Sequence, residues 1–140
     1  MKKIAVVYIS LTGNTGAMAD VVIASLKGRC ELDVYDLGCD TFASPDGYDA
    51  IAFGCPAMGQ EVLEEDTFEP AFSAIEAGLK GKPVALFGSY GWGDGEWMRS
   101  WAQRCMDDGA VLVHDPVIAQ EAPDDEACRA LEALADSLLE

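Results

Sequence analysis

The chain has 140 residues, half of them hydrophobic, with nine Lys and Arg against twenty-five Asp and Glu and a formal net charge of −16. A chain of this length buries about two-thirds of its unfolded surface, which favours one domain spanning residues 1–140. The acidity argues against binding nucleic acid or anionic lipid, because both require Lys and Arg. The apolar run at 4–9 is shorter than the ~20 residues of a membrane span. No signal-peptide cleavage site closes that run, so we expect a cytoplasmic protein.

The cysteines give no sign of a metal site or of a redox-active pair. They are odd in number and widely spaced, and the sequence contains no C-x-x-C motif, which argues against zinc, iron–sulfur and thioredoxin-type chemistry. We expect free thiols in a reducing compartment. The five are Cys30, Cys39, Cys55, Cys105 and Cys128. The only histidine, His114, follows the apolar residue Val113 and is assigned a structural role.

Apolar runs rich in β-branched residues predict five strands, separated mostly by helices. The predicted strands are residues 3–9, 30–36, 49–54, 83–88 and 110–119. Asp115 and Pro116 interrupt the last one and predict a bend or an edge position there.

Apolar residues at helical spacing predict four helices. They cover residues 15–27, 69–79, 96–106 and 124–139. Between the second and third strands, a turn signal at 44–47 leaves room for at most one helical turn. This alternation predicts an α/β fold of three layers, a doubly wound sheet of five parallel strands in the order 2-1-3-4-5 with helices on both faces. Its ligand site lies at the carboxyl ends of the strands.

The first strand ends in a polar loop, Ser10-Leu11-Thr12-Gly13-Asn14-Thr15, which leads directly into a helix. Its hydroxyl and amide groups, the backbone N–H groups and the helix dipole together suit a phosphate. The loop holds no Lys or Arg and matches neither the P-loop nor the dinucleotide pattern. We therefore predict a phosphate monoester bound by neutral donors. A polar turn with a good side-chain N-cap is the alternative.

The loops after the third and fourth predicted strands are rich in glycine, and each carries one large polarizable side chain, Met58 and Trp92. Trp92 lies between two glycines, which supply no packing around it, so we interpret it as a plate for a flat ligand. An aromatic lid over the sheet is the alternative for Trp92, and Met58 alone could simply fill a gap.

These three loops resemble those of the flavodoxin family, above all the segment 88–95, which reads Gly-Ser-Tyr-Gly-Trp-Gly-Asp-Gly. The resemblance is closest to the short-chain flavodoxins of clostridia and related anaerobic bacteria, and it covers essentially the whole chain. It implies a flavodoxin-like fold and one non-covalently bound FMN. It also implies a low-potential carrier of single electrons, cycling mainly between semiquinone and hydroquinone, rather than an enzyme. The implied partners are redox proteins that dock through a basic patch onto a monomer.

The resemblance also implies which residues contact the cofactor. The implied contacts are Ser10, Leu11, Thr12, Gly13, Asn14, Thr15, Ala57, Met58, Gly59, Gln60, Glu61, Ser89, Tyr90, Gly91, Trp92, Gly93 and Asp94. The first six would hold the phosphate, while Met58 and Trp92 would lie against the two faces of the isoalloxazine. Glu61 would accept the flavin N3–H, and the amides of residues 89–91 would reach the pyrimidine edge. The carbonyl of Gly59 would turn toward the reduced ring.

Two residues depart from the clostridial pattern at the turn after the third strand. Gln60 stands where aspartate is expected, and Pro56 stands where serine is expected. The first could change how easily the turn flips, and the second stiffens the approach to it.

An acidic segment follows this turn and is predicted to form a rim around the ring. Its members are Glu61, Glu64, Glu65 and Asp66. Negative charge there disfavours a further electron on the flavin and attracts basic partners.

Other functions of the same topology fit the sequence less well. A receiver domain needs an acidic pair after the first strand, where Ser10 and Thr12 stand, and a small phosphatase needs a C-x₅-R loop. The remaining alternative is another flavin module, either the activator of one enzyme or an NAD(P)H:quinone reductase. Trp92 would obstruct the second substrate of such a reductase.

Overall fold

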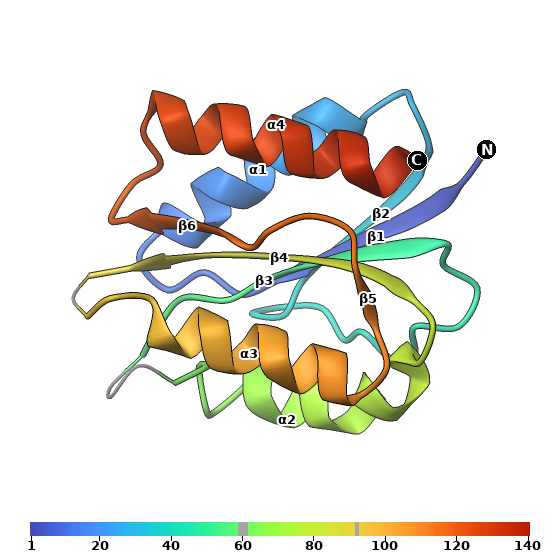
Figure 1. Ribbon diagram of the computed structural model, residues 1–140, viewed down its shortest axis with the longest axis horizontal. Helices are drawn as coiled ribbons and strands as arrows, with labels where there is room; N and C mark the ends of the chain where they lie inside the picture. Colours follow the sequence, from blue (N-terminus) through green and yellow to red (C-terminus); the bar gives the residue numbers. More distant parts are fainter. Residues whose placement is uncertain (59–61, 92) are drawn as a thin grey trace.

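A parallel β-sheet lies between two layers of helices in the computed structural model, which describes residues 1–58, 62–91 and 93–140 (Figure 1). The strands are β1 (Lys3–Tyr8), β2 (Glu31–Asp36), β3 (Ala50–Gly54), β4 (Pro83–Tyr90), β5 (Val111–Leu112) and β6 (Val117–Gln120). Their order is β2-β1-β3-β4-β5, and β6 also pairs with β4. The predicted fold class and strand order are confirmed.

The fifth predicted strand is divided into two short strands. β5 pairs with the beginning of β4, where Pro83 faces Val111, and β6 pairs with its end, where Tyr90 faces Gln120. The break falls at Asp115 and Pro116, as the sequence indicates, because proline has no N–H to donate to the ladder. His114 lies in this break, with Nδ1 2.7 Å from the carbonyl oxygen of Asp115.

The helices agree with the prediction in number and differ slightly in their ends. They are α1 (Asn14–Leu26), α2 (Phe68–Ile75) followed by the 3₁₀ helix η1 (Glu76–Leu79), α3 (Glu96–Asp107) and α4 (Asp125–Leu139). The chain between β2 and β3 forms turns and no helix. Asp124 precedes α4 rather than beginning it, and its carboxylate accepts the N–H of Ala127 at 2.8 Å. This is an N-cap, which stabilises the helix start.

Both faces of the central strands are buried, which explains their continuous apolar runs. Along β1, Ile4 and Val6 contribute to the core beneath α1 and α4, whereas Ala5 and Val7 contribute to the core beneath α2 and α3. Figure 1 shows α1 and α4 over one face of the sheet and α2 and α3 over the other.

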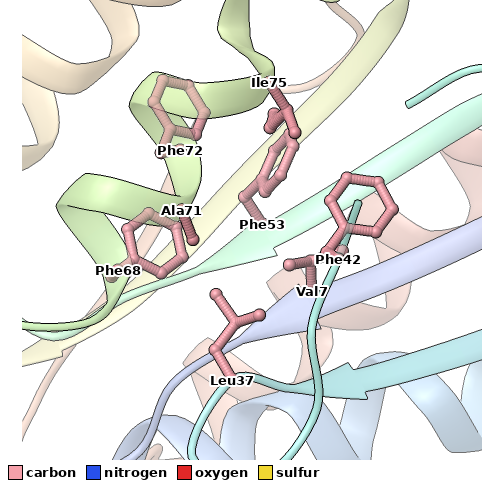
Figure 2. A pocket seen from close by; sticks show the side chains of 8 residues that line it. All are labelled: Val7, Leu37, Phe42, Phe53, Phe68, Ala71, Phe72 and Ile75. Atoms are coloured by element: carbon pink, nitrogen blue, oxygen red, sulfur yellow. The ribbon is translucent and has the colours of Figure 1, made fainter. Parts of the chain in front are cut away.

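The core beneath α2 contains a cavity of about 10 Å³, lined by apolar side chains alone (Figure 2). The lining residues are Val7, Leu37, Phe42, Phe53, Phe68, Ala71, Phe72 and Ile75. A water molecule needs at least this volume and two or more polar partners, which this lining does not offer. The cavity is therefore a packing defect rather than a ligand site.

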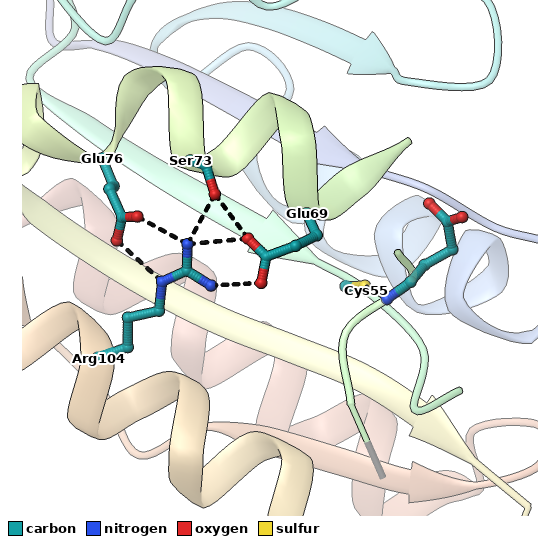
Figure 3. Close-up of polar contacts among 6 residues, drawn as sticks. Cys55, Glu69, Ser73, Glu76 and Arg104 are labelled. Carbon is teal, nitrogen blue, oxygen red and sulfur yellow. Dashed lines mark hydrogen bonds and ion pairs between the residues drawn. The ribbon is translucent and has the colours of Figure 1, made fainter. Parts of the chain in front are cut away.

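A half-buried arginine joins α3 to α2 and η1 (Figure 3). The Arg104 guanidinium donates to Glu69 at 2.6 and 2.9 Å and to Glu76 at 2.7 and 2.9 Å. It also lies over the ring of Phe72, 4.9 Å from its centroid. These charge-assisted hydrogen bonds lower the pKa of both carboxyl groups.

Next to this cluster, the carboxyl group of Asp108 has a raised pKa. Burial and the nearby Glu76 carboxylate raise the pKa of Asp108 from 3.8 to about 6. Arg104 opposes this shift and Asp107 adds to it. A raised folded-state pKa stabilises the protein below the ordinary pKa, and this stabilisation is lost as the pH rises through the folded-state pKa.

We therefore predict that Asp108→Asn raises the melting temperature at about pH 7.5 and leaves it nearly unchanged at about pH 4. Thermal unfolding at the two pH values measures the effect. The matched control is Asp107→Asn, because Asp107 is exposed. The account of Asp108 would be refuted by the same increase at both pH values, or by an equal increase in the control.

Candidate functional site

Three loops meet at the carboxyl edge of the sheet, on the left in Figure 1. They follow β1, β3 and β4, which are neighbours in the sheet and run parallel. Parallel strands bring their carboxyl ends to one edge, so the loops that the sequence singled out are close in space.

The loop after β1 leads into α1, whose N-cap residue has no side chain. Gly13 adopts a left-handed conformation with φ of 93°, and α1 begins at Asn14. The predicted alternative expected Ser, Thr or Asn at the N-cap, but Gly13 takes this position, and Ser10 from earlier in the loop accepts the N–H of Gly16 in the first turn. The first turn carries no acidic side chain. The helix dipole and the backbone N–H groups therefore favour an anion here.

Ser10 is placed so that it faces this helix end. Its Oγ accepts the N–H of Gly16 at 2.9 Å, which leaves the hydroxyl hydrogen available to a ligand. A Cβ on Gly16 would lie 3.1 Å from that oxygen, so glycine permits the close approach. Leu11, with 53% of its surface exposed, and Thr12 are open to solvent at the tip of the loop.

Thr15 and Ser89 connect the first loop to the third. Thr15 is only 1% exposed, and its Oγ1 accepts the N–H of Ser89 at 3.3 Å. The Ser89 hydroxyl donates to the carbonyl of Glu121 at 2.7 Å. The expectation that the Ser89 amide reaches the flavin is therefore not supported, because that N–H is already engaged within the protein.

The described residues on both sides of the loop after β3 are paired with each other and with β4. The N–H of Ala57 donates to the carbonyl of Ser89 at 2.9 Å, which places the loop beside β4. Met58 and Val62 exchange two backbone hydrogen bonds, at 2.8 and 3.0 Å. The predicted contacts Gly59, Gln60 and Glu61 fall between these two residues and lie outside the described residues.

Cys55 fixes the beginning of this loop against β4. A Cβ on Gly88 would lie 2.1 Å from the Cys55 carbonyl oxygen, so only glycine fits beside it. The indole N–H of Trp97 donates to the same oxygen at 3.2 Å. Burial raises the pKa of the Cys55 thiol, so it stays protonated.

The loop after β4 contains two glycines in the left-handed conformation, Gly93 with φ of 89° and Gly95 with φ of 91°. Gly91, Gly93 and Asp94 are exposed. Trp92 lies outside the described residues. The ring of Tyr90 packs on Trp97, with the two centroids 5.5 Å apart.

Asp94 and Arg99 form an ion pair that the sequence analysis did not anticipate. The guanidinium of Arg99 donates to the Asp94 carboxylate at 3.0 Å and to its carbonyl at 2.9 Å. A cation on α3 therefore lies beside the third loop, with its charge matched by a neighbouring carboxylate. Because an exposed pair contributes little to stability, its main effect is to shape the loop.

The predicted acidic rim is only partly correct. Glu65 and Asp66 are exposed, whereas Glu64 is 6% exposed and binds backbone N–H groups within its own segment. Glu64 and Trp97 are therefore residues near the site whose positions sequence reasoning missed. An acidic residue three before Thr67, where α2 is about to begin, was the available signal for Glu64.

Metal binding finds no support in the described residues, which contain no group of three His, Cys, Asp or Glu side chains placed to hold an ion. All five cysteines are free thiols, as predicted. In the part of the chain that the structure describes, no helix is long and apolar enough to cross a membrane.

Comparison with known proteins identifies the family. The flavodoxin family model matches residues 6–132 of the chain. This chain belongs to the flavodoxin family. The flavodoxin of Clostridium beijerinckii is 45% identical over 124 residues, covering 86% of this chain and 88% of that protein. The flavodoxin of Megasphaera elsdenii is 46% identical over 123 residues, covering 85% of this chain and 87% of that protein.

The solved structures agree. The solution structure of two-electron reduced Megasphaera elsdenii flavodoxin has a TM-score of 0.82 and 42% sequence identity to this chain. The matched region covers 94% of this chain and 97% of the Megasphaera elsdenii chain. The protein is therefore a small FMN-binding electron carrier that serves redox partners.

The residues present fit FMN. The N-terminal end of α1, where the N-cap residue Gly13 has no side chain, offers backbone donors to an anion, and its first turn carries no acidic side chain. The exposed loops around it supply neutral donors rather than cations, which suits a single phosphate monoester. FMN, when bound, supplies the one-electron chemistry; the protein binds and orients it.

Proposed function

We propose that residues 1–140 act as one domain that holds the FMN phosphate at the start of α1. The observation that carries this proposal is the helix start at Gly13, an N-cap residue without a side chain, beside the Ser10 hydroxyl and in a first turn free of acidic side chains. The hydroxyls of Ser10 and Thr12 and the amide group of Asn14 donate to the phosphate, together with the N–H groups of Leu11 and Gly13. Thr15 supports this site from beneath through its bond to Ser89.

The isoalloxazine ring lies between the second and third loops in this proposal. Met58 covers one face of the ring. Ala57 precedes Met58, and its N–H donates to the carbonyl of Ser89. The amides of Tyr90 and Gly91 reach the pyrimidine edge, and Gly93 and Asp94 complete the loop. The predicted roles of Gly59, Gln60, Glu61 and Trp92 follow from the family resemblance alone.

The protein acts as a carrier rather than an enzyme in this proposal. The three loops supply hydroxyls, backbone amides and a carboxylate that is already paired with Arg99. This donor set binds a cofactor and orients it. By the family resemblance, Trp92 would also obstruct a second substrate that approached the ring.

We predict that stepwise reduction of the purified protein changes its flavin absorption in two separate one-electron steps. NADH or NADPH alone will leave the spectrum unchanged. A visible spectrum recorded during the titration measures both. Rapid oxidation of NAD(P)H would instead support a reductase, and a protein without flavin absorption that takes up no FMN would contradict the proposal.

The partners are basic redox proteins that dock on the exposed acids beside the second loop. Glu65 and Asp66 are exposed there, and the chain has a net charge of −16. Complementary charge gives fast association that weakens as salt screens it. We propose that the carrier acts as a monomer, away from nucleic acid and membranes. Five free cysteines support a cytoplasmic location.

We predict that affinity for a basic redox partner falls as the ionic strength rises, because the attraction acts between exposed charges. Binding measured at low and at high salt checks this. The same affinity at low and at high salt would contradict docking on the exposed acidic residues.

A further inference from the structure

Glu64 is a buried carboxylate at the start of α2. Three backbone N–H groups donate to it, those of Asp66 and Thr67 at 2.8 Å and that of Phe68 at 2.7 Å. The N-cap residue itself, Thr67, makes no side-chain capping bond. Glu64 therefore caps this helix from three residues upstream of its N-cap, and its charge is satisfied by donors that a helix start leaves free.

The backbone of Glu64 also reaches the end of β3. Its N–H donates to the sulfur of Cys55 at 3.4 Å, and its carbonyl accepts the N–H of Glu69 at 2.9 Å. Figure 3 shows Cys55 beside this segment. Cys55 is itself fixed, because its N–H donates to Phe87 at 3.1 Å and its carbonyl accepts the Trp97 indole N–H at 3.2 Å.

These contacts tie together the two ends of the second loop. The loop leaves the sheet at Cys55 and returns at Glu64, and the Met58–Val62 bridge lies between them. Just before Glu64, Leu63 is buried in the core, whereas Val62 is 39% exposed beside the turn. Glu64 therefore joins the segment that follows Val62 to Cys55, the residue from which the chain leads to Met58.

We propose that Glu64 is a positioning residue for FMN, which holds the paired residues Met58 and Val62 in the place where Met58 receives the flavin ring. This proposal rests on the proposed function. It assigns Glu64 no contact with the cofactor. Because Met58 is proposed to cover the ring rather than to bind the phosphate, loss of Glu64 weakens the binding of FMN and of riboflavin equally.

The test compares Glu64→Ala and Glu64→Gln with the matched controls Glu65→Ala and Glu65→Gln. Glu65 is the exposed neighbour, so each control changes the net charge by the same amount. Dissociation constants for FMN and for riboflavin are measured for every variant. Amide hydrogen exchange at residues 66–68 is measured on the proteins without FMN, which reports the cap independently of the cofactor.

Glu64→Ala is expected to weaken the binding of both FMN and riboflavin about tenfold. It should also speed amide hydrogen exchange at residues 66–68 by a similar factor. Glu64→Gln should recover part of both effects, because its amide oxygen still accepts N–H groups. The Glu65 variants should stay within about twofold of the wild type.

The proposal is overturned if Glu64→Ala speeds exchange while both affinities stay at the wild-type values, since Glu64 would then be only a helix cap. It is also overturned if FMN alone is weakened. A wild-type protein that binds no flavin would overturn the proposed function itself, which is a different result. If Glu64→Ala does not fold, Cys55→Ser is used instead, because it changes the acceptor of the Glu64 N–H and keeps the size of the buried side chain. This variant should still weaken both ligands together, and unchanged affinities would count against the proposal.

Discussion

The function depends on one electrostatic feature, the N-terminal end of α1, whose N-cap residue Gly13 has no side chain. The chain carries a formal charge of −16, so an anion approaching it is repelled on average. At the start of α1 the repulsion of an anion gives way to local attraction, because Gly13 provides no side-chain acceptor and the first turn carries no acidic residue. Backbone N–H groups and the helix dipole act at short range, where the diffuse charge is screened by salt. The site can therefore hold a phosphate without any cation.

The rest of the fold places the loops after β1, β3 and β4 around the start of α1. β1, β3 and β4 are buried on both faces, so the loops at their carboxyl ends are fixed by the core beneath them. Among the described residues, three contacts join these segments: the N–H of Ser89 donates to Thr15, the N–H of Ala57 donates to the carbonyl of Ser89, and Gly88 lies against the carbonyl of Cys55. Glycine at 88 and the indole of Trp97 bring the ends of β3 and β4 close enough for one ligand to touch both loops.

Much of this could be predicted from the sequence, because the signals are local. Apolar runs determine buried parallel strands, and Pro116 marks the break in the last one. The glycine-rich loops stand at strand ends, which is where parallel sheets bind ligands. The sequence did not show which residue caps a helix, which carboxylate is buried or which backbone N–H is already bonded. Gly13, rather than a hydroxyl residue, takes the cap position, and Glu64 is buried only because α2 begins beside Cys55. No local pattern shows that the Ser89 N–H is taken by Thr15, 74 positions away in the chain.

The affinity for FMN relative to riboflavin, which lacks the phosphate, tests the central claim most directly. The account predicts that the wild type binds FMN at least about tenfold more tightly than riboflavin, as charge-assisted hydrogen bonds to a phosphate require. Thr12→Asp places a negative charge at the exposed tip of the loop, so it should remove most of this preference while riboflavin binding stays unchanged. Thr12→Asn, which is neutral and keeps a donor, should preserve it. Equal affinity of the wild type for both ligands, or the same loss in both variants, would contradict the account.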